Sequence, residues 1–374
     1  MKIAVLGAGM VGRAIALDLA KDYIVSSFDN SEANLSSLKN INPAIQTIFA
    51  DLSQYNQYNK WLSPFDIIVT AVPGFMGYNT LEAVINAGKN VVDISFFPEN
   101  ALQLDQLAKQ KSITAITDCG VAPGISNLIL GRLNEEMKIK SFECYVGGLP
   151  KNPKPPFYYK APFSPMDVIQ EYIRPARIME NGKIVTRPAL SEREIIQFDE
   201  VGELEAFNTD GLRSLVYTMS HIPDMKEKTL RYPGHIDLII ALKEAGFFDT
   251  TPLQINNAEI SPLDFTSNLL VNEWKMPENE EEITVMKLII KGEGKTIEYD
   301  LLDRYDAATK TSSMARTTGY SCTAAVNLIA KKIFEKKGVY PLEWVGKDKN
   351  CFDFVIEYLK ERGIDWKKSV FTSV

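Results

Sequence analysis

The segment that decides the fold is Lys2–Gly12, which reads KIAVLGAGMVG. Its first five residues form an apolar run typical of a strand, and a helical pattern begins around the glycines Gly7, Gly9 and Gly12. In a turn of this kind the first glycine permits a tight bend, the second lets the backbone approach a pyrophosphate, and the third lets helix and strand pack closely. The segment therefore predicts a dinucleotide-binding turn at the start of the chain.

Asp29 ends the second predicted strand, 17 residues after Gly12. A carboxylate there accepts hydrogen bonds from the adenosine ribose hydroxyls and repels a 2′-phosphate. Because Asn30 and Ser31 follow it and no arginine does, NAD is favoured over NADP. The alternative for Asp29 is a carboxylate that caps a loop or helix. A flavin could use the same turn, but the rest of the chain offers no further signal for one.

Further cofactor contacts are expected beside the turn and at the ends of later strands. Met10 and Val11 lie between the second and third glycines. The third predicted strand ends where the adenine would lie, and the fourth ends beside the pyrophosphate and nicotinamide; the residues at these two ends are Asp51 and Leu52, and Ala71, Val72 and Pro73.

Up to about residue 124, short β-branched runs alternate with helical patterns. The predicted strands cover residues 3–6, 24–28, 45–49, 66–72, 91–94 and 113–117. Strands separated by helices are typical of a doubly wound parallel sheet. We therefore expect an α/β protein whose N-terminal part is a Rossmann sheet.

The later sequence gives weaker signals. Prolines and aromatic residues crowd residues 150–165, which favours an ordered, stiff loop over a polyproline linker because the segment is too apolar for a solvated tether. Residues 284–290 and 296–301 alternate around a glycine-containing turn and predict a hairpin with one solvent-facing side. Helices are expected at about 321–337, stopped by Gly338, and at 353–362.

Composition excludes several classes of protein. The 374 residues carry 41 Lys and Arg against 48 Asp and Glu, for a net charge of −7, and without a basic cluster neither nucleic acid nor an anionic membrane is an expected partner. The four cysteines form no C-x-x-C pair and there are two histidines, so we predict no metal site and a reducing, cytoplasmic location. The apolar N-terminus imitates a signal peptide only loosely, and no run is long enough for a transmembrane helix.

Taken together and in order, the motifs resemble the saccharopine dehydrogenase family, and within it most closely the L-lysine 6-dehydrogenases. The matching segments beyond the glycine turn are VDIS (92–95), DCGVAPG (118–124), GGLP (147–150), YK (159–160), FSP (163–165), NTDGLR (208–213), TLRYPGH (229–235) and MARTTG (314–319).

This resemblance implies a Rossmann domain made of residues 1–124 and about 312–374, with C-terminal helices returning to it, and a mixed α/β substrate domain at 125–311. The active site would lie in the cleft between them, and a homodimer or homotetramer is expected. Saccharopine-forming relatives typically carry Asp where this chain has Ala122. Its absence favours a substrate smaller than saccharopine.

Several side chains could carry the chemistry of an amine dehydrogenase, because an ammonium must lose its proton before its carbon can give up a hydride. Asp93 ends the fifth predicted strand, and Asp118 and Cys119 end the sixth, so they point towards the nicotinamide end of the crevice. The alternative is that both carboxylates cap turns and that Cys119 fills the core. The candidates for the proton acceptor are Asp93, Asp118, Tyr159, Lys160 and His235, and desolvation of the amine alone could also remove the proton; the sequence does not choose among these.

The expected substrate-binding side chains include a cation for the α-carboxylate of an amino acid. The planar fork of arginine suits that task, and Arg213 is the choice. The remaining expected substrate contacts are Cys119, Gly148, Leu149 and Phe163.

The resemblance implies an NAD-dependent enzyme that oxidatively deaminates the terminal (6-) amine of L-lysine or a close analogue, the product cyclising to a piperideine carboxylate. One rival is an imine reductase that forms a C–N bond, as saccharopine and carboxynorspermidine dehydrogenases do. The other rival is a non-catalytic NAD-binding protein.

Overall fold

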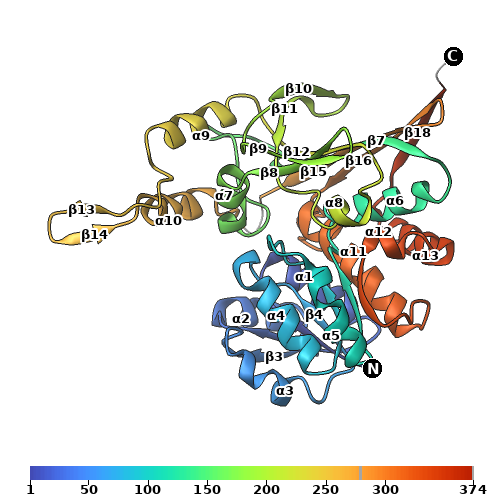
Figure 1. Cartoon of the computed structure of the whole chain (residues 1–374). Coiled ribbons are helices and arrows are strands. Elements are labelled where there is room, and N and C mark those ends of the chain that lie inside the picture. Colours follow the sequence, from blue (N-terminus) through green and yellow to red (C-terminus); the bar gives the residue numbers. More distant parts are fainter. Residues whose placement is uncertain (278–279, 373–374) are drawn as a thin grey trace.

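The computed structural model describes residues 1–277 and 280–372. The first of its two large sheets is a parallel sheet of seven strands within those residues, in the order β17-β6-β5-β4-β1-β2-β3. Figure 1 shows β3 and β4 of this sheet among the helices of the N-terminal part. The strands are β1 (Lys2–Leu6), β2 (Ile24–Asp29), β3 (Gln46–Phe49), β4 (Ile67–Thr70), β5 (Asn90–Asp93), β6 (Thr114–Thr117) and β17 (Gly338–Pro341). The strand order reverses between β1 and β4, which is where an open α/β sheet binds its ligand.

Helices connect these strands and cover both faces of the sheet. They are α1 (Met10–Leu19), α2 (Glu32–Ile41), α3 (Tyr58–Trp61), α4 (Gly74–Asn86) and α5 (Asp105–Gln110), with 3-10 turns at Tyr55–Gln57 and Ala101–Leu104. All six predicted strands are present, and the prediction of a Rossmann sheet is confirmed.

The seventh strand was not predicted. Gly338 was expected to stop a helix, but its φ of +129° begins β17, which pairs in parallel with β6. The preceding helix is α11 (Ser313–Ala330), so the expected span of 321–337 is wrong at both ends. The helix begins early because the Ser312 hydroxyl accepts a hydrogen bond from the backbone N–H of Ala315 and caps it.

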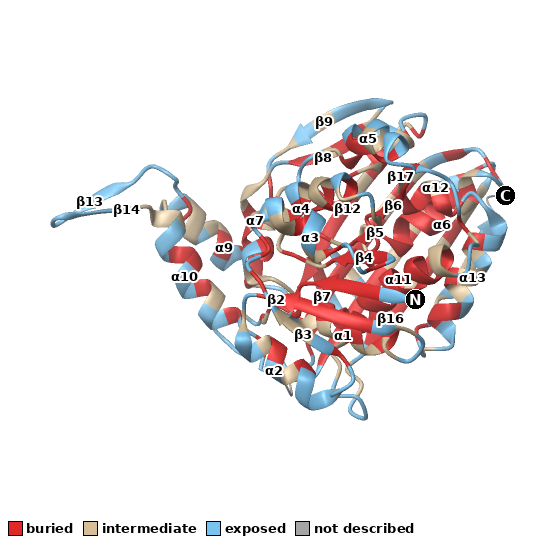
Figure 2. Cartoon of the chain, turned by 90° about the horizontal axis from the view of Figure 1, so that it is seen from below, coloured by how far each residue is buried: buried red, intermediate tan, exposed pale blue. Residues whose placement is uncertain are grey.

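Helix α11 is buried along most of its length and packs on α1 (Figure 2). Gly319 lies at this contact, where a Cβ would be in ordinary van der Waals contact with Ile15 and Ala14. Helix α13 (Lys349–Lys360), which matches the predicted C-terminal helix, packs against α11, and the short α12 (Leu342–Val345) packs against α6 (Ile125–Asn134).

The second large sheet is mixed and has the principal order β10-β11-β12-β7-β15-β16-β18. Strand β8 pairs with β12 at the side of this path, and β9 pairs with β8. Its strands are β7 (Ile139–Pro150), β8 (Ala176–Glu180), β9 (Lys183–Arg187), β10 (Glu194–Phe198), β11 (Gly202–Asn208), β12 (Asp224–Arg231), β15 (Glu282–Gly292), β16 (Lys295–Arg304) and β18 (Lys367–Thr372). Its other helices are α7 (Pro165–Ile173), α8 (Leu215–Thr218), α9 (His235–Glu244) and α10 (Pro262–Trp274). The last described strand, β18, thus belongs to the second sheet, because it pairs with β16.

The predicted hairpin is present as β15 and β16, which pair antiparallel from Ile283–Arg304 to Gly292–Lys295. Strand β16 alternates as expected, but β15 is almost wholly buried. The expectation of one solvent-facing side is therefore wrong for β15. The physical reason is that β15 lies inside the sheet and contributes to apolar clusters on both of its faces.

The proline-rich segment forms no helix between 151 and 164, yet its aromatic side chains are not solvated. Tyr159 is buried against the Trp274 ring, and Phe157 and Phe163 pack against the same cluster. Between α9 and α10 in the chain, the small hairpin of β13 (Leu253–Ile255) and β14 (Ala258–Ile260) extends away from the rest of the molecule and is largely exposed (Figures 1 and 2). No helix in the described residues is long and apolar enough to cross a membrane.

Candidate active site

Two of the three glycines in the turn after β1 have no room for a larger side chain. Gly7 has a φ of +108°, and a Cβ there would lie 2.2 Å from the carbonyl oxygen of Ala71. At Gly12 a Cβ would lie 2.1 Å from the Gly7 carbonyl oxygen. Gly9, in contrast, has nothing within 4 Å of the position of a Cβ. The open space therefore lies beside the middle glycine, where a phosphate would approach the backbone.

The N-terminus of α1 is suited to an anion. Its N-cap is Gly9, so no side chain occupies the free backbone N–H groups of the first turn, which includes the half-buried Met10 and Val11. Such N–H groups and the helix dipole together bind phosphates. These residues fit a dinucleotide, and Gly7, Gly9, Met10, Val11 and Gly12 are the ones that would hold its pyrophosphate.

Asp29 links the glycine turn to the next loop. Its Oδ2 accepts a hydrogen bond of 2.6 Å from the backbone N–H of Ala8, and its Oδ1 accepts one of 2.7 Å from the backbone N–H of Ser31. Ser31 is in turn the N-cap of α2, because its hydroxyl accepts a hydrogen bond from the backbone N–H of Asn34. The carboxylate thus lies beside the glycine turn, where it can also meet an adenosine ribose.

The other expected cofactor residues surround this place. Asp51 is exposed and accepts hydrogen bonds from Ser53, whereas Leu52 is buried beneath it. Ala71 lies against both Gly7 and Gly12. Val72 is buried, and Pro73 is the N-cap of α4.

A hydrogen-bonded contact joins the two domains just after the end of β4. Asp167, on α7, accepts hydrogen bonds of 3.2 and 3.4 Å from the backbone N–H of Gly74 at the start of α4. Burial raises the pKa of Asp167 from its ordinary value to about 6, against the stabilising effect of that hydrogen bond. The second domain is thereby tied to the loop that would face the nicotinamide.

Asp93 is fully buried at the end of β5. Its Oδ1 accepts a hydrogen bond of 2.5 Å from the Thr70 hydroxyl, while its Oδ2 has no partner among the described residues. Burial raises the pKa of this carboxyl from its ordinary value to about 7. A buried carboxyl with a free oxygen and a pKa near neutrality is a suitable proton acceptor.

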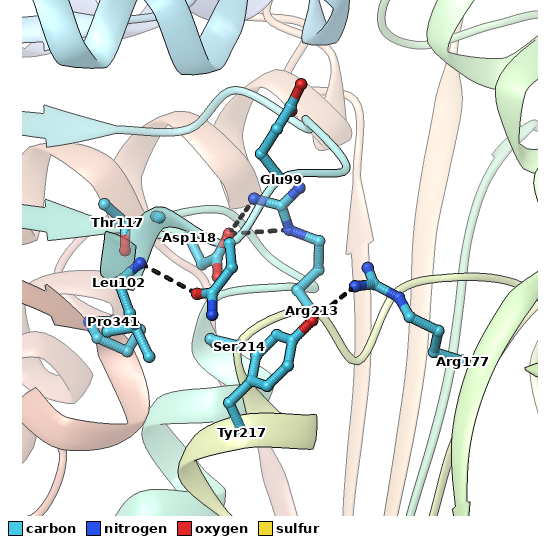
Figure 3. Close-up of a pocket in the computed structure, with 11 residues that line it drawn as sticks. Glu99, Leu102, Thr117, Asp118, Arg177, Arg213, Ser214, Tyr217 and Pro341 are labelled. Atoms are coloured by element: carbon cyan, nitrogen blue, oxygen red, sulfur yellow. Dashed lines mark hydrogen bonds and ion pairs between the residues drawn. The ribbon is translucent and has the colours of Figure 1, made fainter. Parts of the chain in front are cut away.

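Asp118 and Arg213 form an ion pair at the junction of the two domains (Figure 3). The Asp118 Oδ1 accepts from Nη2 of Arg213 at 2.8 Å and from Nε at 3.2 Å, and both side chains are almost fully buried. Nη1 of Arg213 is also buried and has no partner among the described residues. Asp118 is therefore occupied as an acceptor, whereas Arg213 keeps a donor for a ligand.

The other expected proton acceptors lie in different surroundings. Lys160 pairs with Glu273 near the surface, and its ammonium donates to the Glu273 carbonyl oxygen. His235 is buried among aromatic rings, with Nε2 at 2.9 Å from the Tyr172 hydroxyl and Nδ1 at 2.8 Å from the Phe157 carbonyl oxygen. Burial lowers the pKa of His235 to about 3. Both groups are engaged, and we do not include them in the proposed site.

Tyr159 differs from these two because its buried hydroxyl has no partner among the described residues. Its ring is covered by the Arg231 guanidinium at 4.2 Å. Burial raises the pKa of Tyr159 well above its ordinary value, so the phenol stays protonated at neutral pH. It can donate a hydrogen bond but is a poor base.

The remaining expected substrate contacts are mostly packing residues. Cys119 is fully buried in the core, and burial raises the pKa of its thiol well above its ordinary value. Gly148 lies within β7, where a Cβ would lie 2.5 Å from Pro162, and Leu149 is buried on the other face of the strand. Phe163 is half-buried and joins two apolar clusters. Among these, Gly148 and Phe163 border the domain junction.

Two charged residues at this junction were not predicted. Glu227 on β12 is buried, and its carboxylate packs directly on Gly211, where a Cβ would lie 1.8 Å from its Oε1. Burial raises the pKa of Glu227 to about 8. Arg174 follows α7 and stacks over the Phe96 ring at 5.5 Å. Neither lies in a recognisable motif. The only signal for Arg174 is its position directly before Pro175, which ends a helix.

No group of three or more His, Cys, Asp or Glu side chains in the described part of the chain is arranged to hold a metal ion.

The fold and the glycine turn together define a two-domain protein with a dinucleotide-binding Rossmann domain. The family model described as saccharopine dehydrogenase NADP binding domain matches residues 3–116, and the one described as saccharopine dehydrogenase C-terminal domain matches residues 120–364. The chain belongs to the saccharopine dehydrogenase family.

Its similarity to individual relatives is modest. The chain is 27% identical over 278 residues to the NADP(+), L-glutamate-forming saccharopine dehydrogenase of Schizosaccharomyces pombe, covering 70% of this chain and 61% of that one. It is also 27% identical over 268 residues to the alpha-aminoadipic semialdehyde synthase of Arabidopsis thaliana, covering 66% of this chain and 25% of that protein. The chain thus spans about a quarter to three fifths of the length of these curated relatives.

A solved structure of the L-glutamate-forming saccharopine dehydrogenase of Saccharomyces cerevisiae has the same fold. It superposes with a TM-score of 0.79 at 20% identity, covering 99% of this chain and 100% of that one.

Proposed function

We propose that this protein is a nicotinamide-dependent dehydrogenase that oxidises the terminal amine of L-lysine or a close analogue. The observation that carries the proposal is the buried Asp93 carboxyl, whose free Oδ2 lies at the end of β5, two strands from β1 in the parallel sheet. Family membership supports an oxidoreductase acting on carbon–nitrogen bonds. A bound nicotinamide dinucleotide would supply the hydride acceptor.

The role of Asp93 is to take the proton of the substrate ammonium. An ammonium carbon cannot release a hydride, because the developing positive charge would lie beside an existing one. The neutral amine can, and the resulting iminium loses a proton to become an imine, which water hydrolyses to an aldehyde and ammonia. The aldehyde closes onto the α-amine without a further catalytic group. The burial that raises the pKa of Asp93 to about 7 makes it able to accept this proton near neutral pH.

The role of Arg213 is to bind the α-carboxylate. Its Nη1 remains available after the pairing with Asp118. Asp118 acts as a positioning residue, since its carboxylate fixes the plane of the guanidinium fork. The Tyr159 hydroxyl is a buried donor without a partner in the described residues, and it is available to a polar group of the substrate.

A second candidate, the oxidation or formation of a secondary amine such as saccharopine, is favoured by the names of the curated relatives. Ala122 supports lysine, the smaller substrate, because saccharopine-forming relatives typically carry Asp at that position and this chain has no carboxylate there. The test is to incubate the purified protein with L-lysine, saccharopine or carboxynorspermidine, each with NAD or NADP, and to follow nicotinamide reduction. Reduction with saccharopine but not lysine would replace the proposal by the second candidate, and silence with every amine would favour a non-catalytic protein.

We further propose that NAD is preferred over NADP, although the matching family model is described as NADP-binding. The support is Asp29, whose carboxylate would accept hydrogen bonds from ribose hydroxyls and repel a 2′-phosphate.

Replacing Asp29 by asparagine should therefore weaken NAD binding by about tenfold and strengthen NADP relative to NAD, because the repulsive charge is lost. Fluorescence titration with NADH and NADPH measures both affinities. Asn also preserves the shape of the loop, and Asp353→Asn, which changes an exposed carboxylate paired with Lys349, serves as a control. An equal change for the two cofactors would refute this role of Asp29.

A further inference from the structure

Two arginines of the second domain converge on one aromatic ring of the first. The guanidinium carbons of Arg174 and Arg213 lie 5.5 and 5.4 Å from the centre of the Phe96 ring. Arg213 also lies over Phe97, at 4.6 Å. Phe96 comes three residues after Asp93, so this ring lies close in sequence to the proposed proton acceptor. Stacking on a ring holds a guanidinium without using its N–H donors.

Both arginines keep buried donors that are not used within the described residues. Nη1 of Arg174 and Nη1 of Arg213 are enclosed and have no hydrogen-bond partner there. A buried donor without a partner costs free energy, and two such donors around one ring are a feature that a ligand would satisfy. Arg213 is 4% exposed, so its free donor is not explained by contact with bulk water.

The arginines at this place differ in their ion pairs. Arg213 is neutralised by Asp118, and the neighbouring Arg177 is neutralised by Asp210 through hydrogen bonds of 2.8 Å. The guanidinium of Arg174 makes no ion pair in the described residues. Burial lowers the pKa of Arg174, as does the Arg213 charge, while Asp210 and Asp167 raise it. Arg174 is therefore the one arginine of these three without an ion-pair partner among the described residues, and a substrate carboxylate would supply that partner.

We infer that Arg174 and Arg213 form a clamp that binds one carboxylate of the substrate at the domain junction, with Arg174 supplying the guanidinium that has no ion-pair partner in the described residues. The inference deepens the proposed function and rests on its amino-acid substrate. It makes Arg174 a specificity-determining residue, because an amine without a carboxylate would leave the enclosed Nη1 donor of this half-buried guanidinium without a partner. It also explains why the site has parts from both domains, with Phe96 on one side and the arginines on the other.

The direct test uses a ligand that needs no turnover. Hexanoate carries a single carboxylate and no amine, and its binding to the NAD complex is measured by titration calorimetry for the wild type, Arg174→Met, Arg174→Lys and Arg304→Met. Arg304 lies at the surface and pairs with Glu200, so it is a matched control. We expect Arg174→Met to weaken hexanoate by about 10- to 100-fold, Arg174→Lys to weaken it less, and Arg304→Met to leave it unchanged.

A second measurement compares L-lysine with cadaverine, which is lysine without its carboxylate. The wild-type preference in kcat/KM for lysine should fall by about the same factor in Arg174→Met, mainly through KM, whereas the rate with cadaverine should change little. Hexanoate binding that is absent in the wild type, or equal in Arg174→Met and the wild type, would overturn the clamp. If hexanoate distinguishes the variants but no amine is oxidised, the clamp stands and the proposed reaction falls.

Discussion

Replacing Asp93 by asparagine is expected to lower kcat by about 100- to 10,000-fold, while dinucleotide affinity changes by less than about threefold. Asparagine has the same shape and can still accept from the Thr70 hydroxyl, which donates to Asp93 at 2.5 Å. It cannot take a proton from the substrate ammonium. The loss would therefore lie in the chemical step and not in the architecture of β5.

The pH dependence gives an independent check on Asp93. Burial raises the pKa of this carboxyl from 3.8 to about 7, so the ionised form that acts as base is gained as the pH rises through about 7. Wild-type kcat should rise over that range and then level off, and the rise should be absent from the residual activity of Asp93→Asn. The measurement is a steady-state pH profile of both proteins, with the exposed Asp353→Asn as a control. A variant that keeps its rate within tenfold, or keeps the same pH limb, would exclude Asp93 as the proton acceptor.

The second large effect is on stability and concerns the buried pair of Asp118 and Arg213. Replacing Arg213 by methionine should lower the free energy of unfolding by about 3–5 kcal/mol, because it leaves the Asp118 carboxylate buried without its partner. Both side chains are 3% exposed in the pair. The loss should be smaller in the double variant Arg213→Met/Asp118→Asn, because no uncompensated charge then remains.

Urea unfolding monitored by circular dichroism measures this difference, and Arg304→Met again controls for loss of an exposed ion pair. A double variant that loses as much stability as Arg213→Met, or more, would contradict the claim that an unpaired Asp118 carboxylate causes the loss. Thermal melting of the same four proteins should rank them in the same order.

The nucleotide-binding half of the fold could be predicted because its signals are local. Strands such as 24–28 are β-branched runs between helical patterns, and the glycine turn has a steric reason that is visible in the sequence. The strand β17 escaped prediction because it has four residues and its starting glycine, Gly338, reads equally well as a helix stop. The pairing of β18 with β16 is a long-range contact with no local signature.

The candidate site was harder to predict because it is assembled from both domains. Asp118 and Arg213 are 95 residues apart in the sequence, and no periodicity indicates that their side chains meet. His235 was a candidate proton acceptor because it lies in a family motif. In the folded chain it is buried and both of its ring nitrogens are hydrogen-bonded, which no local sequence signal indicates. Arg174 lies outside every motif and is noticed only because its guanidinium lies beside Phe96 without an ion-pair partner in the described residues.

In the proposed reaction, the carbon that bears the terminal amine of lysine gives up the hydride. L-Lysine deuterated at carbon 6 and, separately, L-lysine deuterated at carbon 2 are incubated with the protein and the oxidised dinucleotide, and the reduced dinucleotide is analysed by mass spectrometry. Deuterium should appear in the nicotinamide ring only from carbon 6. Transfer from carbon 2, or no transfer from lysine while saccharopine is oxidised, would contradict the account.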